Sequence, residues 1–348
     1  MKAMCVTAYD RPLEMRERPR PEAPPGYALV KVLACGICFS DVKTIRGRMP
    51  YSDALPLPHV PGHEISGSVV EVNGPAPLSP GDRVVIFHNW ACHRCAACRR
   101  GEENICAEPV AWMGFTHPGG FQEYVAAPVE CLLPVPASIP ATTAPALTCA
   151  IGTAYRAVAV RGAVRPGERV VVIGLGVVGV HAAQVASAAG ATTLGVDRTE
   201  AKLAPARDLG LAALAVSADL EAATREMTEG AGADVVVETT GDPAMIERAR
   251  AVARRGARIV AVGYHVGEPM PVLSDQFVLW EYSLLGSRYC SRADMEHGIQ
   301  LVAQGRLRPV IGDVLPLEEA NRAVERLEAG EATGRLVLSV AGADGAHA

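Results

Sequence analysis

The sequence predicts an α/β protein with a doubly wound parallel sheet that follows a β-rich region. Residues 1–148 carry many prolines, glycines and short alternating apolar segments, which are typical of antiparallel strands. Residues 152–287 alternate apolar strands with alanine-rich helices, which is the pattern of a parallel sheet. The chain of 348 residues is long enough for about two domains.

Each expected element rests on apolar periodicity and on glycine or proline at its ends. Strands that alternate in polarity belong to the first region, and short continuous apolar strands belong to the second. The expected elements are strands at 28–33, 65–72, 170–173, 193–196, 235–238, 258–262 and 283–285, then a helix at 292–304, a strand at 311–316, a helix at 317–329 and a strand at 334–340.

Four cysteines within fifteen residues form the strongest motif: Cys92, Cys95, Cys98 and Cys106. Their spacing lets all four sulfurs lie about 2.3 Å from one tetrahedral Zn²⁺. Because sulfur would fill every position, no water could bind and this zinc would be structural. Two disulfides would need an oxidising compartment, and residues 1–30 contain no signal-peptide pattern. An iron–sulfur cluster would need a different spacing of the fourth cysteine.

Three further residues suggest a second metal with a catalytic role. Cys38 stands in Cys-Gly-Ile-Cys-Phe-Ser-Asp, His63 stands in Pro-Gly-His-Glu, and Cys149 is the best candidate for a distant third ligand. A catalytic zinc usually has three protein ligands and one open position. A single cysteine or histidine is more often a packed or hydrogen-bonded side chain, so the combination carries the prediction.

A glycine motif predicts a dinucleotide site. The apolar residues 169–173 lead into Gly174, Leu175, Gly176, Val177, Val178 and Gly179, and a helix and a second strand then end at Asp197. This order brings a helix N-terminus to the pyrophosphate and a carboxylate to the ribose hydroxyls. Asp197 would repel a 2′-phosphate, so NAD is favoured over NADP. Arg198 could instead pair with a phosphate or stack on the adenine, and Lys202 could reach the same ribose; the alternative for both is a solvated helix start.

Composition and charge exclude several other classes of protein. The net charge of −5, with no basic stripe, argues against nucleic-acid binding as a main activity. No apolar segment approaches the length of a membrane span. We expect a cytoplasmic enzyme with no membrane partner.

Taken in order, these motifs resemble the zinc-containing medium-chain alcohol dehydrogenases over nearly the whole chain. The matching segments are 38–41, 62–64, 81–84, 92–106, 145–149, 174–179 and 334–335. The resemblance implies a GroES-like catalytic domain made of residues 1–151 and 288–348, with the cysteine lobe at 88–108. It also implies an inserted Rossmann NAD-binding domain at 152–287, and we expect a homodimer or homotetramer.

The resemblance assigns roles to individual residues. Cys38, His63 and Cys149 would hold the catalytic zinc, so that the chain carries two Zn²⁺ and NAD(H). Glu64 would be an acid beside that metal, and Asp41 would orient the zinc histidine. Arg335 would bind the pyrophosphate of the cofactor.

The expected reaction is reversible hydride transfer between a primary or secondary alcohol and NAD, which gives an aldehyde or ketone. Ser40, two residues from a zinc cysteine, can take up the substrate proton. Relatives often have a basic residue and a histidine where this chain has Phe39 and Lys43. Lys43 would either end the proton relay or, as we prefer, contact a cofactor phosphate.

The substrate is expected to be bulky and apolar. The segments that line the cleft in relatives carry several large side chains here, namely Trp112, Ile45, Trp90, Met49, Tyr51 and Met113. Tryptophans also serve as core or interface residues. Two other functions stay open: NAD(P)H-dependent reduction of an activated C=C bond, and a non-catalytic NAD- and zinc-binding structural or sensor protein. The complete ligand set and Ser40 weigh against both.

Overall fold

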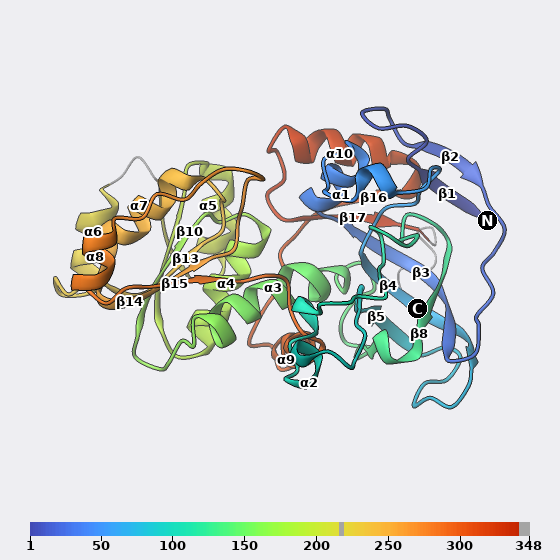
Figure 1. Cartoon of the computed structure of the whole chain (residues 1–348), viewed down its shortest axis with the longest axis horizontal. Coiled ribbons are helices and arrows are strands. Elements are labelled where there is room, and N and C mark those ends of the chain that lie inside the picture. The colour runs from blue at the N-terminus through green and yellow to red at the C-terminus, as the bar shows by residue number, and fades with distance from the viewer. Residues whose placement is uncertain (216–218, 341–348) are drawn as a thin grey trace. The chain divides into compact units, whose positions relative to one another are not determined.

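The computed structural model describes residues 1–215 and 219–340, which form two compact units (Figure 1). The first unit contains Met1–Cys149, Ser291–Ala303 and the chain from Ile311 onward, and the second contains Ala150–Cys290 and Gln304–Val310. The chain leaves the first unit after Cys149 and returns to it at Ser291. It enters the second unit once more at 304–310, which the sequence did not indicate. The expected domain boundaries at 151/152 and 287/288 stay predictions. The end of the expected last segment, residues 341–348, lies outside the described residues.

The first unit is built on a seven-stranded sheet in the order β16-β17-β3-β4-β5-β9, with β8 paired to β3. The described strand pairs are antiparallel except for β16 and β17. The sheet consists of β3 (Tyr27–Ile37), β4 (Glu64–Asn73), β5 (Arg83–Ile86), β8 (Tyr124–Pro128), β9 (Leu132–Pro134), β16 (Ile311–Pro316) and β17 (Arg335–Ser339).

Two small strand pairs and several helices complete the first unit. Strand β1 (Lys2–Cys5) pairs with β2 (Glu14–Glu17), and β6 (Asn89–Trp90) pairs with β7 (Ala111–Trp112). The helices are α1 (Phe39–Ile45), α2 (Ala96–Arg99), α9 (Arg292–Ala303), α10 (Ala320–Glu328), the short 3-10 turns η1 (Ser52–Ala54), η2 (Glu103–Ile105), η3 (Val129–Cys131) and η6 (Leu317–Glu319), and the π-helix η4 (Leu147–Ile151).

The second unit is a six-stranded parallel sheet in the order β12-β11-β10-β13-β14-β15. Its strands are β10 (Arg169–Ile173), β11 (Thr192–Asp197), β12 (Ala212–Ala215), β13 (Ala233–Glu238), β14 (Ala253–Ala261) and β15 (Ser283–Gly286). Its helices are α3 (Gly152–Tyr155), η5 (Arg156–Arg161), α4 (Val177–Ala188), α5 (Glu200–Asp208), α6 (Leu220–Met227), α7 (Pro243–Val252) and α8 (Ser274–Leu279).

The core of the second unit explains its continuous apolar strands. Val171, Val196, Val236 and Ile259 come from four neighbouring strands and are all buried in one cluster. Val170, Val171 and Val172 are consecutive and fully buried, so both faces of β10 are covered, as is typical of a parallel sheet.

The predicted fold class is confirmed, and so are the predicted strands of the parallel sheet. Strand β12 was missed because its sequence, Ala-Ala-Leu-Ala, lacks the β-branched residues that mark the other strands. No helix among the described residues is long and apolar enough to cross a membrane.

Candidate metal and cofactor sites

Two groups of potential metal ligands occur among the described residues. The members of the first are Cys92, Cys95, Cys98 and Cys106, and those of the second are Cys38, His63, Glu64 and Cys149. Within each group the ligand atoms lie within 4.8 Å of one another. The fold therefore brings together both sets of residues that the sequence singled out.

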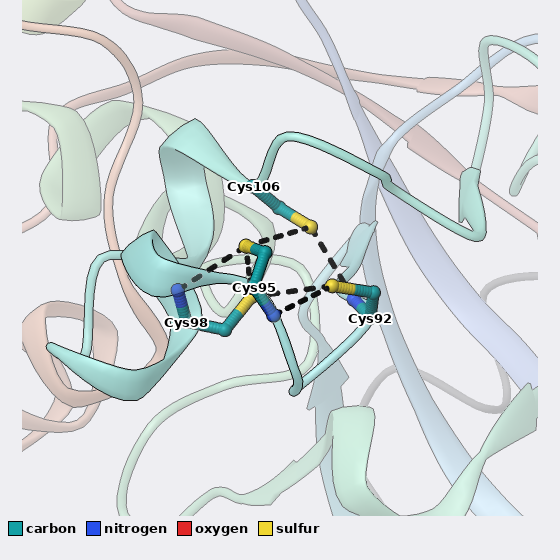
Figure 2. A group of neighbouring side chains, drawn as sticks. All are labelled: Cys92, Cys95, Cys98 and Cys106. Atoms are coloured by element: carbon teal, nitrogen blue, oxygen red, sulfur yellow. Dashed lines mark hydrogen bonds between the residues drawn. The ribbon is translucent and has the colours of Figure 1, made fainter.

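The four-cysteine group lies in the loop between β6 and β7 (Figure 2). Three sulfur pairs are 3.5, 3.9 and 4.0 Å apart. A disulfide would need a separation of about 2.05 Å, whereas four sulfurs bound at about 2.3 Å to one tetrahedral ion lie roughly 3.8 Å from each other. None of the ten cysteines, all of which lie in the described part of the chain, forms a disulfide. The sulfur positions thus fit a shared metal ion and do not fit disulfides.

Backbone amides of the same loop point at these sulfurs. The amide of Cys95 donates to Cys92 Sγ at 3.4 Å, and the amide of Cys98 donates to Cys95 Sγ at 3.5 Å. Donation by the Cys98 amide is the largest cause that lowers the pKa of Cys95 to about 6. Because the thiolate is the form that binds metals, these amides favour the ligating state of Cys95, whereas burial raises the pKa of Cys98 to about 12.

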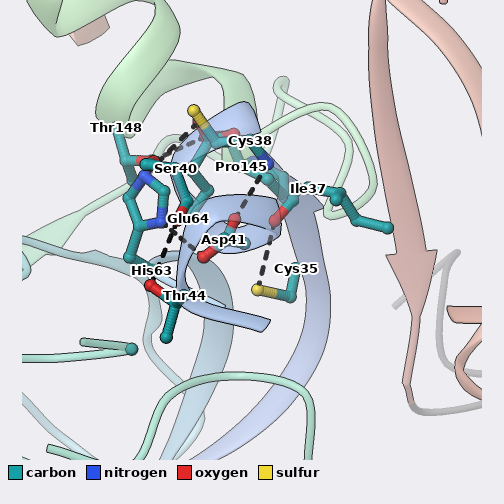
Figure 3. Close-up of polar contacts among 12 residues, drawn as sticks. Cys35, Ile37, Cys38, Ser40, Asp41, Thr44, His63, Glu64, Pro145 and Thr148 are labelled. Atoms are coloured by element: carbon teal, nitrogen blue, oxygen red, sulfur yellow. Dashed lines mark hydrogen bonds and ion pairs between the residues drawn. The ribbon is translucent and has the colours of Figure 1, made fainter. Parts of the chain in front are cut away.

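The second group is assembled from three separate segments (Figure 3). Cys38 immediately precedes α1, His63 and Glu64 stand at the start of β4, and Cys149 lies in η4. His63 is 1% exposed and Glu64 is fully buried, while the two cysteines are half-buried. A hydrogen bond with Cys149 is the largest cause that lowers the pKa of Cys38 well below its ordinary value. Two sulfurs and an imidazole form a donor set that fits zinc.

Asp41 holds this group in place from the first turn of α1. Its Oδ1 is 2.8 Å from His63 Nδ1, and its Oδ2 accepts the amide of Cys38 at 2.8 Å. Both side chains are buried. The contact assigns the Nδ1 proton to the bond with the carboxylate, which leaves His63 Nε2 as the donor toward a metal. Asp41 therefore orients both Cys38 and His63.

Glu64 and Arg335 form a buried ion pair beside the same group. Arg335 Nε lies 2.8 Å from Glu64 Oε2, and its Nη1 donates to the carbonyl of Ile37 at 2.7 Å. Burial raises the pKa of Glu64 to about 7, although the guanidinium opposes this shift. Sequence reasoning missed this pair, and the role of Arg335 at a pyrophosphate stays a prediction.

Ser40 and Lys43 lie on α1, next to the second group. Both are half-buried, and the Ser40 carbonyl accepts the hydroxyl of Thr44 at 3.1 Å. Lys43 Nζ lies 6.0 Å from the ring centroid of Phe39, which is 52% exposed. Burial lowers the pKa of Lys43. The relay role of Ser40 and the phosphate role of Lys43 stay predictions.

The expected pocket residues occupy different environments. Ile45 and Met113 are fully buried, and Trp90 is buried against Tyr27 and His117, with centroids 5.9 and 4.6 Å away. Trp112 is half-buried, and its ring lies 6.1 Å from that of Tyr51. Met49 is also half-buried. Of the predicted set, Trp112 and Tyr51 therefore lie in the same ring cluster.

Two aromatic residues beside the second group were missed. Phe115 lies 4.6 Å from the His63 ring, and His88 lies 4.8 Å from it, measured between centroids. Phe115 also meets Tyr51, at 6.4 Å. Neither residue stands in a recognisable motif, so only the tertiary structure reveals their place.

The main chain around His63 is closely packed. A Cβ atom at Gly119 would lie 2.1 Å from the carbonyl oxygen of Gly62 and 2.7 Å from that of Pro61. Gly119 and Gly120 also donate their amides to Val60 and Gly62, at 2.7 Å each. The residues just before His63 are therefore held by a neighbouring loop that has no room for side chains.

The glycine motif forms the turn from β10 into α4. The amide of Gly174 donates to the carbonyl of Val196 at 2.8 Å, and a Cβ at Gly179 would lie 1.7 Å from the Gly174 oxygen. Gly176, Val177 and Val178 are half-buried at the helix start, whereas Leu175 is buried. Thr239 Oγ1 donates to the Gly174 carbonyl at 2.9 Å, a contact that sequence reasoning missed. The turn thus presents a helix N-terminus of the kind that binds phosphates.

Asp197 lies at the end of β11 with its carboxylate held by the backbone. Its Oδ2 accepts the amide of Leu175 at 2.8 Å, and its Oδ1 accepts the amide of Thr199 at 2.9 Å. The carboxylate is therefore fixed beside the glycine turn, where an adenosine ribose would lie in a dinucleotide-binding fold. Arg198 is exposed and Lys202 is half-buried.

Comparison with known proteins agrees with this geometry. The alcohol dehydrogenase GroES-like domain family matches residues 24–137, and the zinc-binding dehydrogenase family matches residues 176–304. An alcohol dehydrogenase of Geobacillus stearothermophilus is 36% identical, over 98% of this chain and 99% of its own. An acryloyl-coenzyme A reductase of Metallosphaera sedula is 31% identical, over 97% and 100%.

A solved structure supports the same relationship. The crystal structure of an NAD-dependent alcohol dehydrogenase superimposes with a TM-score of 0.89 at 33% identity, over 98% of this chain and 100% of that one. Both cysteine-containing groups and the glycine turn lie within segments that these relatives share. The chain belongs to the zinc-containing medium-chain alcohol dehydrogenase family.

Proposed function

We propose that this chain is an NAD-dependent alcohol dehydrogenase that binds two zinc ions, one in the four-cysteine lobe and one at Cys38, His63 and Cys149. The observation that carries the proposal is the second group, in which two thiols and a carboxylate-oriented histidine meet. Three protein ligands leave one position open for substrate. A zinc ion bound there would supply Lewis acidity toward an alcohol oxygen.

Asp41, Ser40 and Lys43 have separate roles in the proposed reaction. Oxidation of a primary or secondary alcohol sends a hydride from its carbon to NAD and a proton from its oxygen to the protein. Asp41 keeps His63 in the ligating tautomer, and Ser40, which is half-buried near Cys38, accepts the alcohol proton while it releases its own hydroxyl proton onward to solvent. Lys43 contacts a cofactor phosphate, because a lysine stays largely protonated at neutral pH unless its pKa falls by several units.

The proton relay gives the most direct test of this mechanism. Ser40→Ala should lower kcat for alcohol oxidation by about 10²- to 10⁴-fold, the usual range for a lost acid–base partner. Metal content and NAD binding should stay unchanged. Ser79→Ala, at an exposed serine in a distant loop, is the matched control. A Ser40→Ala enzyme with normal kcat would rule out the relay.

Lys43→Ala distinguishes the two roles of the lysine. As a phosphate contact, it should chiefly raise the KM for NAD and make that KM less dependent on salt. As the end of the relay, it should lower kcat and respond to added small amines. Amine rescue with an unchanged KM for NAD would overturn the phosphate role.

Cofactor choice is proposed to rest on Asp197. Because its carboxylate is fixed by two amides, it would meet a 2′-phosphate without being able to turn away. Asp197→Gly should shift the ratio of kcat/KM toward NADP by roughly ten- to a hundredfold. A wild-type enzyme that prefers NADP would show instead that Arg198 dominates.

Reduction of an activated C=C bond is the second candidate, because an acryloyl-coenzyme A reductase is among the relatives. A panel of primary and secondary alcohols, aldehydes, ketones and enones, assayed with NAD(H) and NADP(H), separates the two. Turnover of alcohols that stops on removal of metal supports the dehydrogenase. Turnover of enones alone supports the reductase, and no turnover of any compound supports a non-catalytic protein.

A second copy of the chain is the proposed macromolecular partner, in a homodimer or homotetramer. Val278 and Leu279 of α8 are 75% and 74% exposed, and Val266 is 64% exposed. Large apolar side chains that are this exposed suggest an interface. Light scattering should give a multiple of the monomer mass, which Val278→Asp should reduce.

Ten cysteines without a disulfide fit a reducing compartment, and we place the protein in the cytoplasm.

A further inference from the structure

The four-cysteine lobe is an insertion between two paired strands. Asn89 of β6 lies opposite Trp112 of β7, and Trp90 lies opposite Ala111. Two further backbone bonds extend the pairing, from Val110 to Trp90 at 2.8 Å and from Met113 to His88 at 2.9 Å. The lobe therefore closes on a short ladder whose strands continue directly into the residues around His63.

The buried side-chain amide of Asn89 joins the lobe to this ladder. Asn89 is 3% exposed, and its Nδ2 donates to the carbonyl of Glu103 at 2.5 Å. The same carbonyl accepts the amide of Cys106, the fourth cysteine, at 3.0 Å. Asn89 Oδ1 accepts the indole N–H of Trp112, also at 2.5 Å. The amide nitrogen of Asn89 thus bonds to the lobe, and its oxygen bonds to Trp112.

A series of ring contacts connects Trp112 to the second metal group. Its ring lies 6.1 Å from Tyr51, the Tyr51 ring lies 6.4 Å from Phe115, and Phe115 lies 4.6 Å from His63. These rings thus connect Trp112 to the histidine of the proposed catalytic site. A shift of the indole would therefore change the space available to a bulky alcohol.

From these contacts we infer that Asn89 is a positioning residue: it fixes the Trp112 indole to the cysteine lobe, so that the folded lobe sets the size of alcohol accepted beside His63. The inference rests on the proposed function for its substrate. Loss of the amide would remove the acceptor of the indole N–H and one of the two donors to the Glu103 carbonyl, a cost that favours rotation of the ring. A merely structural amide would affect stability alone.

The first experiment compares Asn89→Ala with Asn321→Ala. Asn321 is a matched control because its side chain also donates and accepts, with the backbone of Leu13 at 3.0 and 2.7 Å. Asn89→Ala should raise the KM for a bulky aromatic alcohol about five- to twentyfold and leave kcat within about twofold. The KM for ethanol and the metal content should not change. Equal effects in both variants would overturn the inference.

Tryptophan emission tests the link without any turnover. Asn89→Ala should shift the emission spectrum in the wild-type background and have no effect in a Trp112→Phe background. An unchanged spectrum in the wild-type background would overturn the inference. If wild-type protein oxidises no alcohol, the proposed function and the size selection fail together, and the emission alone decides whether Asn89 fixes Trp112.

Trp112→Phe keeps the test decisive if Asn89→Ala does not fold. It removes the indole N–H and retains an aromatic ring, so the KM for the bulky alcohol should again rise at least about fivefold. Trp280→Phe is its control, since Trp280 belongs to the second unit and contacts Tyr282. A KM unchanged in Trp112→Phe, or raised equally in Trp280→Phe, would contradict the positioning role.

Discussion

The four-cysteine lobe and the group of Cys38, His63 and Cys149 gather similar ligands by different routes. The lobe draws all its sulfurs from residues 92–106, and local backbone amides point at them. The second group draws on three segments, and buried Asp41, Glu64 and Arg335 surround it. Consequently the geometry of the lobe depends on one loop, whereas the geometry of the second group depends on the fold of the whole first unit.

The largest expected effect separates the two groups by function. His63→Ala should lose one of two zinc ions and at least about a thousandfold in turnover, because several kcal/mol of transition-state stabilisation depend on the metal. The melting temperature should change far less. Metal analysis measures the zinc content and an alcohol oxidation assay measures turnover, with His297→Ala, at an exposed position of α9, as the control. Full activity with a single zinc would contradict the comparison.

The converse variant should damage stability. Cys95→Ala removes one of four clustered ligands, and because metal binding and loop folding are coupled, the melting temperature should fall by roughly 10 °C or more. Cys131→Ala, which removes a buried sulfur outside both groups, provides the control for calorimetry. If both variants melt alike, the lobe does not depend on its metal.

A smaller effect is expected from the side chain that orients the histidine. Asp41→Asn keeps the size of the side chain but weakens its charge-assisted bonds to His63 and to the Cys38 amide. The affinity of the second group for zinc should fall about ten- to a hundredfold, as for other orienting carboxylates. Competition with a chelator measures this. Loss of metal from the lobe instead would reverse our assignment of the groups.

The smallest effect concerns charge at the lobe surface. Arg94 and Glu108 form an ion pair 2.8 Å long whose side chains are mostly exposed. Exposed pairs contribute little, so Glu108→Gln should change the melting temperature by at most about one degree. The measurement is calorimetry at low and high salt. A larger change would mean that surface charge contributes to the stability of the lobe, as buried charge does in the second group.

The same contrast explains what the sequence could predict. Ligands spaced by two residues on one loop, such as Cys92 and Cys95, are close in any fold, so their motif alone predicted their meeting. The strand, glycine turn and Asp197 formed an equally local pattern. Cys149 was the best candidate for a distant third ligand, and the resemblance to a family assigned it to the group, although nothing in its neighbours indicates where that segment packs.

Most contacts between distant segments could not be predicted from the sequence. Arg335 meets Glu64 because β17 and β4 both flank β3, a pairing that neither residue's neighbours specify. Phe115 and His88 reach His63 through loop geometry, which has no periodic signal. Ile45 and Met113, which we expected near substrate, are fully buried, and their place beside a substrate stays a prediction.

Gly119 has a consequence for how this sequence can vary. A Cβ at this position would lie so close to the carbonyls of Gly62 and Pro61 that any side chain would displace the segment just before His63. A position with no functional group thus constrains a metal ligand through steric exclusion alone. In a library of random single substitutions, active clones should be as rare at residue 119 as at residue 63, and a survey of tolerated changes would mark both as equally sensitive.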